Sequence, residues 1–311
     1  MIEVLRAPAF AAVQDGGREG HRAAGVPPGG ALDALSLGAG NALLGNEAGA
    51  AGIEWALSGG ALRFHADARV VLAGARVDAT LDGVPAPTGR VLAARAGAEL
   101  VIERLVGGRL LYVCVAGGID VPIVLGGRGT YLPAGFGGFE GRLLRARDRL
   151  PLGAARPGAR VGAWLPAEAD VGESLAFGRA RAIRCLPGPD ADALSTAAWT
   201  RLASTELTVD PRSDRSGYRL VGLGPQGGAP ADRRSQPTCV GSVQLPPDGT
   251  LVVLMADGPT VGGYPQVAVV ASADLPHLAQ RAAGERVLLT PCSPDAAVGA
   301  LIAWSALIGG R

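Results

Sequence analysis

The sequence predicts a mainly β protein made of two similar β lobes with a few short helices. The 311-residue chain contains 48 glycines and 23 prolines that follow no period, a composition that favours short strands joined by tight turns. Hydrophobic residues make up 48% of the chain, enough to build a core without metal ions or disulfide bonds. A faint internal duplication then divides the β material into two lobes.

Alternating or continuous apolar residues mark the expected strands. In residues 76–83, Val77, Ala79 and Leu81 point to one face, and the Asp82-Gly83 pair is typical of a hairpin turn. Apolar runs of strand length occur in later parts of the chain as well. They predict further strands at 110–115, 219–223, 251–255, 267–271 and 286–290.

Capping and stop residues predict three helices. The first covers residues 31–44 and ends at Gly45, and a short one follows Asp274. The last starts at a serine cap and covers residues 293–309, with Pro294 at its first helical position. Its apolar residues form a face that is expected to pack on a sheet: Val298, Leu301, Ile302 and Ile308.

The duplication rests on three matches in the same order. The pattern R-x-G-[HY]-R-x-x-G occurs at residues 18–25 and again at 215–222. Downstream of these, Glu54 and Gln244 each precede a glycine by five residues and lead into an apolar strand. Upstream, the start of the chain resembles residues 183–186.

These matches predict two domains, an N-terminal β lobe at residues 1–165 and a C-terminal β lobe at residues 166–311. The boundary is expected in the charged stretch rich in proline and glycine between residues 157 and 181. The alternative is one continuous sandwich.

The charge balance excludes several classes of partner and cofactor. The net charge of +1 is too small to draw the chain to nucleic acid or to an anionic membrane surface. All 29 basic residues are arginines. Without lysine the chain cannot form a Walker A loop or a pyridoxal phosphate Schiff base, and it cannot carry covalently attached biotin.

The remaining reactive residues are scattered. The four cysteines contain no C-x-x-C pair, so we expect reduced thiols in a cytoplasmic protein. The three histidines are equally dispersed, and no metal site is predicted. The N-terminus has no signal-like segment, and the 15-residue uncharged stretch at 296–310 is too short to span a bilayer.

Two loops of the expected second lobe combine residue types that bind small molecules. Residues 213–219 place a carboxylate, arginines and a phenol around one glycine, and arginine forks suit carboxylate or phosphate groups. Residues 257–265 place an acid, a hydroxyl and a phenol directly after a strand, where β folds often hold ligand contacts. The alternatives are a structural turn in which Asp214 pairs with an arginine, and a plain surface loop.

Glycine runs in the first lobe carry less information. Residues 135–142 superficially match a dinucleotide-binding fingerprint but lack its strand–turn–helix context. Residues 116–120 end a strand with Arg128 nearby, and suit close approach of a ligand or of the other lobe. Neither a G-x-S-x-G nucleophile elbow nor an H-E-x-x-H zinc motif occurs.

Taken together, several motifs resemble one family. They are VQDGGREGHRAAGVPPGGALD, AGGIDVP, GFGGFEGRLL, SDRSGYRL, and VQLPPDG followed by LMADGPTVGGYP. In this combination the chain is similar, over nearly its whole length, to the KipA family, also called allophanate hydrolase subunit 2 or the biotin-dependent carboxyltransferase domain. The pattern departs at Ser216 and Pro259, where the family commonly has methionine and glutamine.

The resemblance implies cyclophilin-like β-barrel lobes and the role of the C subunit in a prokaryotic ATP-dependent 5-oxoprolinase. Such a complex opens 5-oxoproline to glutamate together with a KipI-like B subunit and a LamB/YcsF-like A subunit. ATP is then expected at a shared site or on a partner subunit.

The resemblance also implies site residues. The candidates for proton transfer are Asp214 and Asp257, either of which could carry this role. A cleft for a small carboxylate or amide substrate is expected to involve Arg215, Tyr218, Arg219, Gln244, Thr260, Gly262, Gly263 and Tyr264. The candidates in the first lobe are Asp15, Arg18, Arg22, Glu54 and Arg128.

Two other functions remain open at this point. One is half of a biotin-dependent carboxyltransferase that acts on urea or a related amide and receives carboxybiotin from a separate carrier. The other is a non-enzymatic protein that neutralises a KipI-like kinase inhibitor. All three functions require a heteromeric partner.

Overall fold

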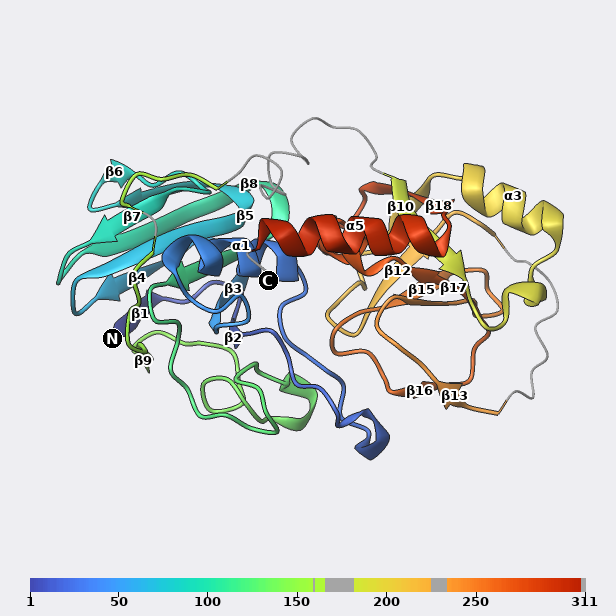
Figure 1. The fold of residues 1–311 in the computed structure, drawn as a ribbon, viewed down its shortest axis with the longest axis horizontal. Helices are drawn as coiled ribbons and strands as arrows, with labels where there is room; N and C mark the ends of the chain where they lie inside the picture. The colour runs from blue at the N-terminus through green and yellow to red at the C-terminus, as the bar shows by residue number, and fades with distance from the viewer. Residues whose placement is uncertain (159, 166–181, 225–233, 309–311) are drawn as a thin grey trace. The chain divides into compact units, whose positions relative to one another are not determined.

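The computed structural model describes residues 1–158, 160–165, 182–224 and 234–308 (Figure 1). The chain divides into two compact units. The first comprises Met1–Arg18, Gly29–Gly178 and Trp304–Arg311, and the second comprises Glu19–Pro28 and Arg179–Ala303. The expected boundary at residues 165 and 166 falls beside residues 166–181, which lie outside the described part of the chain.

In the described residues of the first unit, nine strands form one antiparallel sheet. Six of them follow the order β2-β3-β8-β4-β1-β9, while β5 pairs with β8 and also carries β6 and β7. The strands are β1 (Ile2–Arg6), β2 (Phe10–Gln14), β3 (Gly52–Ala56), β4 (Gly60–Phe64), β5 (Ala68–Leu81), β6 (Val84–Pro85), β7 (Val91–Ala94), β8 (Glu99–Val115) and β9 (Arg149–Leu150). Their inward side chains, including Trp55, Phe64 and Leu100, form the hydrophobic core.

In the second unit, the described strands close into a barrel in the order β10-β17-β14-β15-β12-β11-β18. They are β10 (Ala182–Pro187), β11 (Leu207–Val209), β12 (Gly217–Val221), β14 (Ser242–Gln244), β15 (Leu251–Leu254), β17 (Gln266–Val270) and β18 (Arg286–Pro291). A separate two-stranded ribbon pairs β13 (Gln236–Pro237) with β16 (Val261–Gly262). Closure gives each of the seven described barrel strands a partner on both sides.

The described helices are short and few. They are α1 (Ala34–Leu44), α3 (Thr196–Ser204), α4 (Leu275–Ala279) and α5 (Pro294–Leu307), with 3₁₀ turns η1 (Arg22–Ala24), η2 (Leu132–Ala134), η4 (Ala191–Ala193) and η5 (Ser272–Asp274). Within the described residues, no helix combines the length and the apolar character that crossing a membrane requires. The prediction of a mainly β protein with a few short helices is therefore confirmed.

Local signals predicted most elements well. The hairpin turn lies at Asp82-Gly83, with φ of 50° and 76°, between the paired residues Leu81 and Val84. Helix α1 ends at Gly45 in the left-handed conformation, although it starts at Ala34 rather than at residue 31. Helix α3 was not predicted, although Ser195 caps it by accepting a hydrogen bond from the Ala198 amide at 3.2 Å.

The repeated arginine–glycine pattern adopts two different structures. Residues 215–222 run into strand β12, whereas residues 18–25, all of them described, contain the 3₁₀ turn η1 and no strand. The residues of η1 also belong to the second unit, so Arg22 is not the first-lobe residue that the sequence predicted. A pattern built from arginine and glycine specifies flexibility and charge, and tertiary contacts decide its local conformation.

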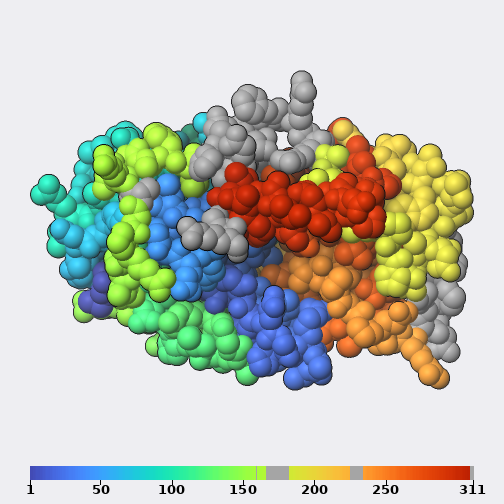
Figure 2. Space-filling model, in the orientation of Figure 1, coloured from blue at the N-terminus to red at the C-terminus, as the bar shows by residue number. Residues whose placement is uncertain are grey.

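Helix α5 differs from the prediction in its packing. It begins after the Ser293 cap as expected, but none of its residues is buried. Val298 and Ile302 are 56% and 64% exposed, and Figure 2 shows the red surface of α5 open on the face in view. The expectation that Val298, Leu301 and Ile302 pack on a sheet is therefore wrong, while Ile308 lies against Gly38 of α1.

Candidate functional site

A pocket of about 360 Å³ lies in the barrel unit. This volume is in the range of small-molecule sites. Four of the predicted site residues line it: Asp214, Arg219, Gln244 and Tyr264. The structure thus brings together side chains from two loops and two strands that lie up to 50 residues apart in the sequence.

Strand register explains why Arg219 and Gln244 share this pocket. Arg219 of β12 and Gln244 of β14 both pair with Val252 of the intervening strand β15. Residues in one cross-strand row project from the same face of a sheet, two strand spacings or about 10 Å apart. The preceding residues Tyr218 and Val243 are fully buried in the barrel, so the row of Arg219 and Gln244 faces outward.

Gln244 is nevertheless only 5% exposed, because the loop that contains Gly262 and Tyr264 lies over it. A Cβ atom on Gly262 would stand 2.3 Å from Nε2 of Gln244, so this position has no room for a side chain. Nε2 itself is buried and has no hydrogen-bond partner among the described residues. Since buried donors are almost always paired, this amide group is suited to a ligand oxygen that enters the pocket.

Charged groups surround the amide. Arg219 is exposed, and within the described residues no ion pair involves its guanidinium. The neighbouring Arg212 is bound to Asp210 by two hydrogen bonds of 2.8 Å, and these bonds hold the pKa of Asp210 far below its usual value. Arg219 is therefore the guanidinium best placed to bind a carboxylate in this pocket.

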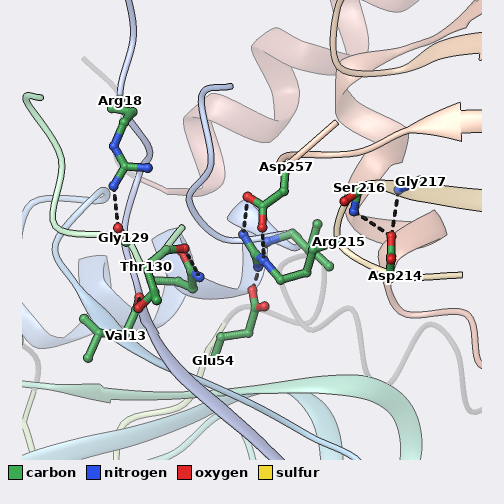
Figure 3. Close-up of polar contacts among 12 residues, drawn as sticks. Val13, Arg18, Glu54, Gly129, Thr130, Asp214, Arg215, Ser216, Gly217 and Asp257 are labelled. Carbon is green, nitrogen blue, oxygen red and sulfur yellow. Dashed lines mark hydrogen bonds and ion pairs between the residues drawn. The ribbon is translucent and has the colours of Figure 1, made fainter. Parts of the chain in front are cut away.

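Asp214 forms the turn that leads into β12. One of its carboxylate oxygens accepts hydrogen bonds from the amides of Ser216 at 2.8 Å and Gly217 at 3.1 Å (Figure 3). The carboxylate is exposed and lines the pocket. A carboxylate on the pocket wall suits proton transfer to or from a bound ligand, and this role stays a prediction.

Arg215 and Asp257 make a buried ion pair (Figure 3). Nε and Nη2 of Arg215 donate to the two carboxylate oxygens of Asp257 at 2.8 and 3.1 Å. The Asp257 amide also donates to the carbonyl of Arg215 at 3.0 Å. The pair joins the two motif loops of the barrel unit, and neither residue lines the 360 Å³ pocket. Proton transfer by Asp257 and substrate binding by Arg215 stay predictions.

The other second-lobe candidates lie around the pocket rather than in it. Tyr218 is fully buried, and its hydroxyl donates to the carbonyl of Ala279 at 2.6 Å. The carbonyl of Thr260 accepts a hydrogen bond from the Thr238 amide at 3.0 Å. Gly263 continues the loop toward Tyr264. These residues shape the barrel and the loop that covers Gln244.

The first-lobe candidates are largely engaged in structural contacts. Arg18 is 1% exposed and donates to the carbonyl of Gly129 (Figure 3). Its guanidinium carbon also lies 5.0 Å from the ring centre of Phe136. Asp15 accepts hydrogen bonds from the amides of Gly17 at 2.9 Å and Arg128. These contacts fix the loop around Gly129.

Glu54 and Arg128 are also bound within the first unit. Glu54 is fully buried and accepts hydrogen bonds from the Leu32 amide at 3.0 Å and the Tyr112 hydroxyl at 2.7 Å. Arg128 pairs with Asp120 at 3.0 Å. Glu54 and Gln244 occupy matching positions in the sequence duplication, but their hydrogen bonding differs. Among the described residues, the carboxylate of Glu54 accepts hydrogen bonds from protein donors, whereas Nε2 of Gln244 has no acceptor.

Sequence reasoning missed two charged residues of the pocket, Arg212 and Asp248. Arg212 directly precedes the SDRSGYRL motif, and Asp248 lies within the VQLPPDG motif, so both positions were within reach of the sequence. The structure offers no metal centre, because the described residues contain no cluster of three or more histidine, cysteine or acidic side chains that could hold an ion.

Comparison with known proteins identifies the family. The model of the carboxyltransferase domain, subdomain A and B, matches residues 24–291. The chain belongs to this carboxyltransferase domain family. The C subunit of the 5-oxoprolinase of Escherichia coli (strain K12) is 37% identical over 300 residues, which cover 96% of this chain and 94% of that protein.

Solved structures of the family share the fold. The crystal structure of the K. lactis urea amidolyase superposes with a TM-score of 0.90 at 26% identity, covering 99% of this chain. That of TTHA0988 superposes with a TM-score of 0.80 at 33% identity, covering 94% of this chain. This carboxyltransferase domain spans only 20% of the urea amidolyase chain and 56% of the TTHA0988 chain.

Proposed function

We propose that this chain is the C subunit of an ATP-dependent 5-oxoprolinase and that the pocket of the barrel unit binds 5-oxoproline. The observation that carries the proposal is the 37% identity to the C subunit of the E. coli 5-oxoprolinase over nearly the full length of both proteins. This match covers 94% of the E. coli protein, whereas the match to the K. lactis urea amidolyase covers only 20% of that chain.

The chemistry of the pocket supports this substrate. 5-Oxoproline is a small lactam with one carboxylate and one amide carbonyl. Arg219 offers an exposed guanidinium for the carboxylate, and Gln244 offers an amide nitrogen, unpaired within the described chain, for the carbonyl. A buried donor on the lactam oxygen also stabilises the negative charge that develops there when water adds to the carbonyl carbon.

The reaction adds water across the lactam carbon–nitrogen bond. The oxygen of water bonds to the carbonyl carbon, the ring bond to nitrogen breaks, and the nitrogen takes up a proton, giving glutamate. Asp214 is the exposed carboxylate on the pocket wall that we assign to proton transfer. ATP hydrolysis drives the step from a shared site or from a partner subunit.

The proposed partners are a KipI-like B subunit and a LamB/YcsF-like A subunit. The four cysteines are all free thiols, which supports the cytoplasm as the proposed location. Without any lysine, the chain itself cannot carry biotin.

The decisive experiment is co-expression with the neighbouring B and A subunits and an assay of ATP-dependent glutamate release. We expect turnover only with all three chains. Arg219→Ala should raise KM for 5-oxoproline, whereas the control Arg201→Ala, which removes an exposed arginine of α3, should not. An inactive complex of all three chains, or equal KM values for the two variants, would reject the proposal.

A second candidate function is the carboxyltransferase half of a urea-converting enzyme. It is favoured by the superposition of 99% of this chain on the K. lactis urea amidolyase with a TM-score of 0.90. The same preparations distinguish it: consumption of carboxybiotin that depends on urea, without glutamate release, would support this second function.

A further inference from the structure

An arginine from the start of the chain reaches the loop that covers the pocket. Arg22 lies in η1 (Arg22–Ala24), within the segment Glu19–Pro28 that belongs to the barrel unit. Its Nη2 donates to the backbone carbonyl of Thr238 at 2.5 Å and lies 3.4 Å from the Thr238 hydroxyl. The two residues are separated by 216 positions in the sequence.

Thr238 connects Arg22 to the loop of residues 259–264. It is 7% exposed and directly follows strand β13, which pairs with β16 of the loop. Its amide donates to the carbonyl of Thr260 at 3.0 Å, and its hydroxyl donates to the carbonyl of Pro259 at 2.5 Å. Because a guanidinium can only donate, its approach to the hydroxyl oxygen leaves the hydroxyl hydrogen for Pro259.

The loop in turn forms part of the pocket. Pro259 and Tyr264 line it, and Gly262 lies directly against Nε2 of Gln244. A chain of contacts therefore runs from Arg22 through Thr238 to the group that we assign to the lactam carbonyl.

We propose that Arg22 is a positioning residue that holds the loop of residues 259–264 over Gln244. Arg22 contacts the carbonyl oxygen and the hydroxyl oxygen of Thr238. The amide and the hydroxyl of Thr238 both donate to carbonyls of the loop. Arg22 itself does not line the pocket, so it acts on substrate binding only through the loop. The effect on catalysis rests on the proposed function, while the effect on the loop does not.

The kinetic test uses the complete three-subunit complex with Arg22→Ala and Arg22→Lys. Loss of a hydrogen bond from a charged donor should loosen the loop and raise KM for 5-oxoproline about tenfold, with a much smaller change in kcat. The rise in KM should be smaller for Arg22→Lys than for Arg22→Ala, because lysine keeps a charged donor group. Thr238→Val, which removes the hydroxyl link to Pro259, should raise KM in the same direction.

Hydrogen exchange of this chain tests the loop directly. Arg22→Ala should speed exchange of the Thr238 amide, which donates to Thr260, while Arg201→Ala should leave it unchanged. If the wild-type complex has no 5-oxoprolinase activity but exchange still responds to Arg22→Ala, the proposed function fails and the positioning role stands. If KM and exchange of the Arg22→Ala protein match those of Arg201→Ala, the positioning role is overturned.

Discussion

Replacement of Gln244 by methionine should make the protein more stable and less able to bind its substrate. Nε2 of Gln244 is buried without a partner in the described part of the chain, and a buried unsatisfied donor costs about 1–3 kcal/mol. Methionine has a similar length and no branch, so it fits the space under Gly262 without that cost. We therefore expect the free energy of unfolding to rise by about 1–3 kcal/mol.

The matched control is Gln266→Met in the neighbouring strand β17. Gln266 is 3% exposed, accepts a hydrogen bond from the Ser242 hydroxyl at 2.8 Å and donates to the carbonyl of Pro237 at 2.9 Å. Its replacement removes both of these hydrogen bonds, so this variant should lose stability where Gln244→Met gains it. The two substitutions are chemically identical and differ only in whether the amide is satisfied.

Equilibrium urea unfolding, followed by tryptophan fluorescence and circular dichroism, measures both variants. Trp199 of α3 reports on the barrel unit. In the reconstituted complex, Gln244→Met should also raise KM for 5-oxoproline about tenfold, the equivalent of one lost hydrogen bond. If Gln244→Met destabilised the chain as much as Gln266→Met and left KM unchanged, the amide would not be a ligand group.

The contacts of individual side chains lead to three further predictions. Asp257→Asn breaks a buried ion pair and should lower the free energy of unfolding by about 3–5 kcal/mol in urea titrations; an unchanged midpoint would show that the pair is not structural. Burial acts to raise the pKa of Asp274, but hydrogen bonds from Arg184 outweigh it and hold this pKa below its usual value. The ionised Asp274 carboxylate therefore stabilises the fold fully above about pH 4, and this contribution is lost as the pH falls through the lowered pKa. In urea titrations at several pH values, Asp274→Asn should remove the fall in the unfolding midpoint that protonation of Asp274 causes. The thiol of Cys239 is exposed, whereas burial raises the pKa of Cys114 to about 12, so mass spectrometry after brief alkylation at pH 8 should find Cys239 labelled and Cys114 unlabelled; labelling at equal rates would contradict the burial.

The sequence by itself determined the local structure wherever a short stretch of backbone decides the outcome. The Asp82-Gly83 turn, the end of α1 at Gly45 and the start of α5 after Ser293 each depend on the conformational preference or the capping bond of one or two residues. Strand positions followed from apolar runs of strand length, which are also a local feature of the sequence. The motifs also indicated that Asp214, Arg219, Gln244 and Tyr264 belong together.

Only the tertiary structure decided what those groups can do. Asp214, Arg219 and Gln244 are all polar motif residues, yet cross-strand register and one covering loop leave Nε2 of Gln244 unpaired among the described residues. Arg22 looked like part of the first lobe because sequence distance says nothing about which unit a loop joins. Helix α5 shows the converse, since an apolar sequence cannot specify whether a neighbour covers it. Pairing, register and burial depend on residues that are distant along the chain, and the folded structure alone defines them.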